Sequence, residues 1–324
     1  MSAPQELIIG QEDKDKFKRL DQFLSDKLPD YSRSLIKKLF EDGHFKSDQK
    51  LELKKMPKLG TRILVTPPEF NETDLKAENI PLEILFEDEH LIILNKAAGM
   101  VVHPAPGNYT GTLVNAILYH CPTLEGIGNE KRPGIVHRLD KGTSGVMVVA
   151  KNQKTHEGLV KLFSTHDINR FYEALVLGVR LPQTDTLESL IGRNPNNRLK
   201  MSTKVKAANG KRALTHMKVI NYFHHFSHVE LKLETGRTHQ IRVHLSELLN
   251  CPILNDETYG RKKEEQKVLP TKLRPLLKDY EHPFLHAKTL GFKHPITGEY
   301  IEFTTPPPDI FKKVLEVLVE DIHE

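Results

Sequence analysis

The sequence predicts an α+β protein: a large domain on a mixed, largely antiparallel sheet with helices packed on it, preceded by a small α/β module. The first observation is that residues 82–303 consist mostly of short apolar runs separated by turn residues. The second is that these runs do not alternate regularly with helical stretches, which disfavours a doubly wound parallel sheet. The third is that two amphipathic helical stretches lie ahead of this region, within about 50 residues. With 324 residues, 38% of them hydrophobic, the chain can bury a substantial core.

The amino-terminal part predicts a compact module between two polar segments. Residues 1–17 are polar and mixed in charge, so we expect a flexible segment there. The module covers residues 18–66, and its first helix is indicated by apolar residues at helical spacing, namely Leu20, Phe23, Leu24 and Leu28. Ser32 can cap a second helix that ends at Gly43. Short strands near residues 44–45 and 61–66 complete the module, and the proline-rich, acidic residues 67–81 predict a linker.

The second domain is predicted to cover residues 82–324. Its strands are indicated by apolar, β-branched runs at residues 91–94, 134–139, 146–150, 172–178 and 228–233. Helices are expected at residues 113–119 and 155–164, and another begins near Thr238. After three prolines, Asp309 can cap a final amphipathic helix, which would dock on the core.

Composition excludes several classes of protein. No run of 18 apolar residues occurs, which excludes a membrane-spanning helix, and the first residues lack the order of a secretory signal. Cys121 and Cys251 are too few for a disulfide framework or a four-cysteine zinc site. We therefore predict a cytoplasmic protein that has no contact with a membrane.

Positive charge is concentrated in one part of the chain. Between Leu190 and Val243 eleven Lys or Arg residues face two Glu residues, a local charge of +9 in a chain whose net charge is +4. This concentration favours a basic surface that binds a polyanion. The alternative is a solvated loop whose charges do not share a face.

Several familiar chemical sites are missing from the sequence. It contains no P-loop and no HExxH, and the serine at Gly142–Gly145 lacks the spacing of a nucleophile elbow. His224, His225 and His228 are crowded, but Glu230 is the only carboxylate near them. We expect no metal there, and we interpret these histidines as solvated or facing nucleic acid.

Two stretches bear residues that suit chemistry. In the first, Asp140 follows an apolar segment and precedes a tight turn, which fixes its carboxylate, although turn chemistry alone favours an aspartate that only caps the turn. In the second, Arg242 lies close to the start of a helix, where the helix dipole does not stabilise a positive charge. A buried carboxylate partner would explain it, and an exposed, hydrated arginine is the alternative.

Four blocks of sequence together resemble the RluA/RluD-type pseudouridine synthases, over nearly the whole chain. They are Leu94–Pro104, His137–Gly145 (HRLDKGTSG), Tyr172–Gly178 and Gly236–His244 (GRTHQIRVH). The module at 18–66 resembles an S4 RNA-binding domain through Arg19-Leu20-Asp21, Ser32-Arg33 and Gly43. Among these enzymes the RluD-type branch is the most similar.

The resemblance implies an isomerase that converts specific uridines of large-subunit (23S-type) ribosomal RNA to pseudouridine, without cofactor or metal. Asp140 would be the essential carboxylate, either attacking the sugar or removing a ribose proton, and Arg242 would be its partner. Tyr172 would stack on the detached base, although its spacing also suits a core aromatic. Arg138 would fill the gap left by the flipped uridine.

The remaining predicted site residues would contact RNA. They are His137, Arg237 and His239 near the cavity, Arg193, Arg198 and Lys200 in the basic segment, and Arg33, Lys37 and Lys38 in the S4-like module. We expect the protein to act as a monomer on ribosomal RNA or its precursor. Two alternatives are a non-catalytic RNA-binding or ribosome-assembly factor on the same scaffold, and a metal-free hydrolase of N-glycosidic bonds.

Three residues depart from the family pattern. Ala97 stands where the first motif usually has Pro, Arg170 replaces the usual Lys before the tyrosine block, and Asn255 replaces a Gly. None of these residues is expected to do chemistry. The departures therefore bear on the choice of substrate more than on activity.

Overall fold

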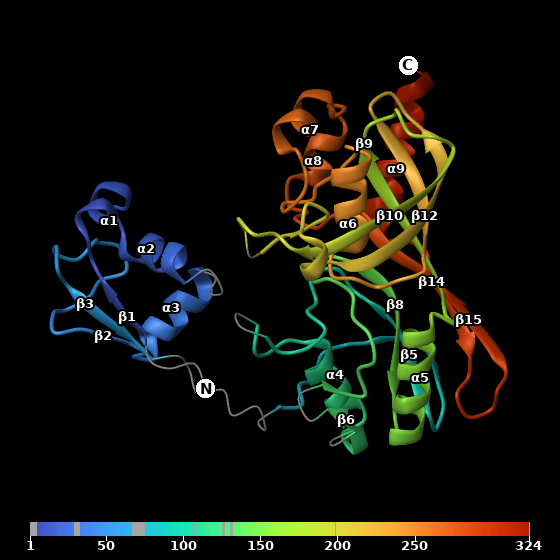
Figure 1. Ribbon diagram of the computed structural model, residues 1–324, viewed down its shortest axis with the longest axis horizontal. Coiled ribbons are helices and arrows are strands. Elements are labelled where there is room, and N and C mark those ends of the chain that lie inside the picture. Colours follow the sequence, from blue (N-terminus) through green and yellow to red (C-terminus); the bar gives the residue numbers. More distant parts are fainter. Residues whose placement is uncertain are drawn as a thin grey trace. The chain divides into compact units, whose positions relative to one another are not determined.

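A computed structural model describes residues 5–28, 33–66, 75–105, 108–124, 127–129, 132–197 and 199–323. The chain divides into two compact units (Figure 1). Unit 1 comprises residues 1–76 and 104–110, and unit 2 comprises residues 77–103 and 111–324. Within the described ranges, no helix combines the length and the apolar character needed to cross a bilayer.

Unit 1 packs short helices against a small antiparallel sheet. Its elements are β1 (Gln5–Ile8), α1 (Gln11–Lys16), α2 (Leu20–Lys27), α3 (Arg33–Glu41), β2 (Phe45–Lys46) and β3 (Arg62–Val65), with strand order β1-β3-β2. Leu20, Phe23 and Leu24 of α2 are fully buried, as their helical spacing predicts. Gly43 follows α3 with φ +79°, the left-handed conformation expected just past the end of a helix.

The amino-terminal segment differs from its prediction. Residues 5–16 were expected to be flexible, but Gln5–Ile8 pair with β3 and Gln11–Lys16 form α1. The reason is that Leu7 and Ile9 both enter the core of unit 1, with Ile9 only 1% exposed. Two buried side chains in a three-residue apolar run are too few to give a periodic signal in the sequence.

Unit 2 is built on one ten-stranded sheet. Its strands are β4 (Glu83–Glu87), β5 (Leu91–Lys96), β8 (Ser144–Ala150), β9 (Asn169–Leu177), β10 (Thr184–Arg193), β11 (Met201–Ser202), β12 (Lys211–Tyr222), β13 (Phe226–Leu233), β14 (Leu285–Lys293) and β15 (Tyr300–Thr304). The order is β11-β10-β12-β13-β9-β14-β8-β5-β4, and β15 also pairs with β14. In the described part of the sheet only β14 and β8 are parallel neighbours. The predicted mixed, largely antiparallel α+β fold is therefore confirmed.

Helices and short elements complete unit 2. They are α4 (Leu113–His120), a 3-10 turn η1 (Pro122–Leu124), the small ladder β6 (Gly128–Asn129) with β7 (Arg132–Pro133), α5 (Gln153–Thr165), η2 (Ala207–Asn209), α6 (Gln240–Val243), the π-helix η3 (His244–Leu248), α7 (Lys262–Val268), α8 (Leu273–Leu277) and α9 (Asp309–His323). In Figure 1, α5 lies along β5 and β8. The last helix docks through Phe311, Val314 and Leu318, as its pattern predicts.

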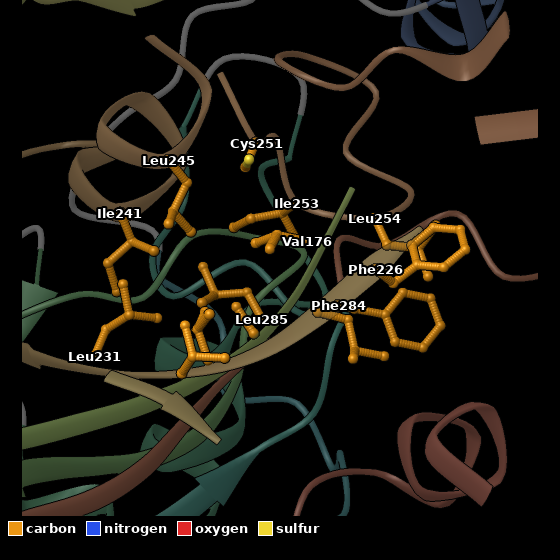
Figure 2. Close-up of a cluster of buried hydrophobic side chains, with 14 of the residues drawn as sticks. Val176, Phe226, Leu231, Ile241, Leu245, Cys251, Ile253, Leu254, Phe284 and Leu285 are labelled. Atoms are coloured by element: carbon orange, nitrogen blue, oxygen red, sulfur yellow. The ribbon is translucent and has the colours of Figure 1, made fainter. Parts of the chain in front are cut away.

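The core beside α6 fixes the orientation of that short helix. Ile241 of α6 and Leu245 of η3 point into a cluster that also contains Val176 of β9 and Phe226 of β13 (Figure 2). Both helical residues are at most 4% exposed. Burial of apolar side chains on this scale contributes roughly 1.5–3 kcal/mol each, so α6 cannot rotate about its axis without a large loss.

The run at residues 134–139 was predicted to be a strand, and this is wrong. Only Ile135 forms an isolated bridge, with Val149 of β8. The Val148 amide, at the edge of β8, donates to His137 Nε2 at 3.2 Å. The His137 side chain thus accepts the hydrogen bond that the backbone of a neighbouring strand would otherwise accept. Residues 136–140 are therefore free to leave the sheet and line a cavity.

Glycine is required where β8 and β14 meet. Gly145 has φ +121°, and a Cβ atom there would lie 2.1 Å from the carbonyl oxygen of Ala287. The close parallel pairing of the two strands thus depends on a residue without a side chain. Strand β14 in turn separates β8 from β9, so it joins the two halves of the sheet.

Candidate active site

A cavity of about 470 Å³ opens in unit 2 where three chain segments meet. The segments are residues 136–143, the stretch from Phe163 at the end of α5 to Tyr172 on β9, and residues 233–242 leading into α6. A volume of this size suits a small ligand such as one nucleotide. Three of the four sequence blocks that suggested a function contribute to its wall.

Asp140 sits in the wall on a tight turn. The Thr143 amide donates to the Asp140 carbonyl at 3.0 Å, which closes the turn. The turn requires a glycine at position 142, because a Cβ atom there would lie 2.6 Å from the ring of Pro283. The Asp140 side chain is 18% exposed, so it is reachable from the cavity and held by its surroundings.

Arg242 lies between two carboxylates. Its Nη1 donates to Asp140 Oδ2 at 3.3 Å. Its Nε and Nη2 donate to the two oxygens of Asp256 at 2.7 and 2.8 Å, a bidentate pairing. Asp256 also accepts the backbone amides of Thr258 and Tyr259. Asp256 is thus the buried carboxylate partner expected for Arg242, and Asp140, with a side chain 18% exposed, is a second partner.

Charge pairing outweighs desolvation at these groups. Burial lowers the pKa of Arg242, but its hydrogen bonds and charge interaction with Asp256, supported by Asp140, raise the pKa above its ordinary value. Burial raises the pKa of Asp256, but the Arg242 guanidinium brings it below its ordinary value. Arg242 therefore presents a full positive charge at the cavity wall.

Strand β9 supplies the opposite wall. Residues two apart on a strand share a face, and Arg170 and Tyr172 both line the cavity while Glu173 lies on the other side of the sheet. Burial raises the pKa of Tyr172, so its phenol keeps its proton. The Arg170 guanidinium donates to the carbonyls of Leu233 and Glu234, which supports the loop that carries Gly236.

His239 and Tyr259 complete the surroundings of Asp140. His239 Nε2 lies 3.9 Å from Asp140 Oδ2, and its Nδ1 lies 2.8 Å from the Tyr259 hydroxyl. The Tyr259 ring also lies against the guanidinium of Arg242, 5.1 Å from its carbon. Cation–π contact of this kind holds the guanidinium plane in place.

The other predicted cavity residues differ in exposure. Arg138 is exposed at the wall, whereas Arg237 is half-buried there and its Nε donates to the Arg212 carbonyl at 3.0 Å. His137 turns inward instead: its ring stacks on Phe163 at 4.5 Å, and burial lowers its pKa to about 3. As an uncharged acceptor of the Val148 amide, His137 shapes the wall and does not present a cation to RNA.

The other residues predicted to contact RNA belong to both units. Lys200 lies 5.7 Å from the centre of the Tyr259 ring, beside the site, and Arg193 is exposed at the end of β10. Lys37 is exposed on α3, 3.9 Å from Glu41. Arg198 and the side chains of Arg33 and Lys38 lie outside the described part of the structure.

The crowded histidines do not form a metal site. His228 Nε2 lies 3.2 Å from Glu173 Oε2 inside the sheet, and His224 Nε2 contacts the Asp321 carbonyl at 3.1 Å. Within the described ranges no group of three His, Cys, Asp or Glu residues lies close enough to hold a metal ion. The two cysteines are buried and unpaired.

Sequence reasoning missed three residues of this region, namely Asp256, Tyr259 and Lys96. Asp256 is the bidentate partner of Arg242, and the signal for it was the aspartate just before Tyr259-Gly260. Lys96 is 1% exposed, and its Nζ donates to the carbonyls of Ala97 and Met100 at 2.8 and 2.9 Å, and to Lys141 at 3.4 Å. Burial lowers its pKa to about 7, although the charge of Asp140 opposes this shift.

The fold and this cavity together define the class of the protein. A family model described as RNA pseudouridylate synthase matches residues 90–247, which include every segment of the cavity wall except Leu285. The solved structure of human RNA Pseudouridylate Synthase Domain Containing 4 superposes with a TM-score of 0.57 at 27% identity, over 73% of this chain and 93% of that chain. Human RNA Pseudouridylate Synthase Domain Containing 1 gives a TM-score of 0.55 at 27% identity, over 72% and 86%.

Curated relatives match almost the full length of the chain. It is 42% identical to Ribosomal large subunit pseudouridine synthase D of Zymomonas mobilis, over 93% of this chain and 94% of the relative. It is 40% identical to the Uncharacterized RNA pseudouridine synthase YlyB of Bacillus subtilis, over 97% and 98%. The chain therefore belongs to the RluA/RluD-type family of RNA pseudouridine synthases, which are isomerases, and the resemblance seen in its four motifs is confirmed.

Proposed function

We propose that this protein isomerises specific uridines of large-subunit ribosomal RNA to pseudouridine, with Asp140 as the essential carboxylate. The observation that carries the proposal is the pair formed by Asp140 and Arg242, 3.3 Å apart in the wall of a nucleotide-sized cavity. The names of relatives from Zymomonas mobilis and Pseudomonas aeruginosa support the choice of ribosomal RNA. We also propose a cytoplasmic location, because the protein would meet ribosomal RNA there.

The reaction conserves all atoms of the uridine. The bond between N1 and C1′ breaks, the base rotates, and C5 bonds to C1′; C5 then loses its proton and N1 gains one. Asp140 acts at the start, either by attacking C1′ or by removing the proton on C2′, and both routes require its ionised form. The guanidinium of Arg242, fixed by Asp256, supplies the compensating charge.

The other walls of the cavity suit a detached base. Tyr172 presents an aromatic ring on which uracil can stack, and its raised pKa keeps the phenol neutral. The uridine must leave its stack to enter, at a cost of a few kcal/mol. Arg138, exposed at the wall, has a flat guanidinium that can occupy the gap left in the RNA.

Phosphate contacts are proposed for two separate surfaces. In unit 2 they are Arg193, Lys200 and Arg237, which belong to the basic segment predicted from the sequence. In unit 1 they are the basic residues of α3, in a module that we interpret as an S4-like domain. Two weak contacts on one RNA raise each other's effective concentration, so together they bind more tightly than either alone.

The test is an assay on transcribed fragments of large-subunit ribosomal RNA. RNA treated with the protein is digested to nucleosides, and pseudouridine is separated from uridine by chromatography. We expect pseudouridine from the wild type and from Asp309→Asn, a control at an aspartate 85% exposed. Asp140→Asn should bind RNA equally well and form none.

The outcomes separate the competing functions. Pseudouridine formed by Asp140→Asn would remove Asp140 from its role. Release of free uracil by the wild type would indicate a glycosidic hydrolase. Binding without any product from the wild type would favour a non-catalytic RNA-binding factor.

A further inference from the structure

The backbone of His239 adopts an unusual conformation at the cavity. Its φ is +56°, in the left-handed region that costs a non-glycine residue of order 1–3 kcal/mol. It immediately precedes α6, where asparagine, aspartate or serine is more usual, and its side chain makes no capping hydrogen bond. A strained residue without a capping role suggests that its side chain is needed in this position.

The contact between the Tyr259 hydroxyl and His239 Nδ1 is the basis on which we assign the proton of the His239 imidazole to Nε2. This hydroxyl accepts the backbone amide of Met201 at 2.7 Å, so its own proton is available for His239 Nδ1 at 2.8 Å. Burial raises the pKa of Tyr259 to about 12 and lowers that of His239, so both groups are neutral at pH 7. With Nδ1 as the acceptor, the remaining proton of the imidazole lies on Nε2.

The nitrogen to which we assign the proton faces the carboxylate of Asp140. Nε2 of His239 lies 3.9 Å from Oδ2 of Asp140, the same oxygen that accepts from Arg242 at 3.3 Å. In the described part of the chain no donor is bonded to Oδ1. Two donors on Oδ2 would turn Oδ1 toward the substrate, and hydrogen bonds of catalytic groups often shorten only once the substrate is bound.

We propose that His239 is a positioning residue for Asp140: held by the Tyr259 hydroxyl, it donates from Nε2 to Oδ2 and leaves Oδ1 for the ribose. This inference rests on the proposed role of Asp140. It differs from the RNA contact predicted for His239 from the sequence, because a positioning residue acts on the rate and an RNA contact acts on the affinity.

The experiment compares His239→Gln with His239→Asn. The amide nitrogen of Gln can reach the place of Nε2 and keep a donor near Asp140, whereas Asn reaches only the place of Nδ1. For each we would measure the RNA dissociation constant and the single-turnover rate of pseudouridine formation at saturating RNA. We expect His239→Asn to lower this rate about 10- to 100-fold with little change in affinity, and His239→Gln to restore most of it.

Tyr259→Phe tests the orientation of the imidazole. As a single substitution it should lower the rate at saturating RNA. Added to His239→Asn it should lower the rate no further, because the hydroxyl acts through His239. Weaker RNA binding with an unchanged saturating rate in His239→Asn would overturn the inference, as would equal losses of rate in the Asn and Gln variants. A wild type that forms no pseudouridine would refute the proposed function and the inference with it.

Discussion

At the scale of single residues, Arg242 shows how a buried positive charge is neutralised and held in place beside a reactive carboxylate. A lone guanidinium in this position would be strongly destabilising, and one carboxylate that also has to react would be an unreliable partner. Asp256 resolves this conflict, because it holds Arg242 by two hydrogen bonds while its side chain is fully buried. Asp140 is thereby left with one hydrogen bond from Arg242, at 3.3 Å.

Replacing Asp256 by Asn should therefore be costly. Arg242 would keep its charge in a buried place but lose its bidentate carboxylate partner, and only the single hydrogen bond to Asp140 would be left. We therefore expect the free energy of unfolding to fall by about 3–5 kcal/mol. Urea denaturation at pH 7 measures this change. Asp309→Asn, at an exposed aspartate beside Lys312, is the control and should show no resolvable difference. A loss in Asp256→Asn no larger than in this control would contradict the account.

Glu173 gives a prediction for the effect of pH. Burial raises its pKa, but hydrogen bonds from His228 and Lys288 bring it down to about 2 from an ordinary 4.5. Because the folded pKa is depressed, the stabilisation is complete above about pH 4.5 and is lost as the pH falls toward 2. Glu173→Gln should lower the unfolding free energy by up to about 3 kcal/mol at pH 7. In denaturation series the difference from wild type should shrink below pH 4.5; a constant difference would show that the charge of Glu173 is not its cause.

Single residues were predicted unevenly from the sequence. Arg242 could be singled out because an arginine near a helix start needs a partner, and the structure supplies two. The inward turn of His137 could not be foreseen, because it depends on an amide of β8 and on the ring of Phe163. Such partners lie in other elements, and local sequence says nothing about them.

At the scale of elements, most strands and helices could be predicted from apolar runs and helical spacing, but the segment at residues 134–139 could not. Strands β5, β8, β9 and β13 follow from short apolar, β-branched runs, and α2 and α9 follow from apolar residues at helical spacing. The segment at 134–139 has the composition of a strand but leaves the sheet, because the His137 side chain takes an edge amide of β8. Whether a run becomes a strand depends on the availability of a neighbour's edge.

The parallel pairing of β8 with β14 should be the part of the sheet where a substitution lowers the free energy of unfolding most. Gly145→Ala would place a methyl group 2.1 Å from a backbone oxygen at φ +121°, so the strands must separate. We expect a loss of roughly 3–5 kcal/mol in the free energy of unfolding. Gly298→Ala is the matched control: its φ is +76°, but nothing lies within 4 Å, so only about 1–2 kcal/mol of backbone strain is expected. Equal losses in the two variants would show that crowding at β14 is unimportant.

At the scale of the whole molecule, the concentration of positive charge should appear as a salt dependence of RNA binding. Each phosphate contact releases counterions, so Lys200→Ala should lower the slope of log affinity against log salt by about 1. Fluorescence anisotropy with labelled RNA at several salt concentrations measures the slope. Lys161, exposed on α5 and outside the basic segment, provides the control. An unchanged slope in Lys200→Ala would exclude a phosphate contact by this residue.

The position of β14 has a consequence for the order in which the enzyme matures. This strand comes late in the chain, at residues 285–293, yet it lies between β8 and β9 in the finished sheet. In a growing polypeptide that has emerged only as far as α8, Asp140 and Arg242 lie on two separate halves of the sheet. The strand that joins these halves has not yet been made. The protein should thus be inert during its translation until residues 285–293 have been released and β14 has joined the sheet.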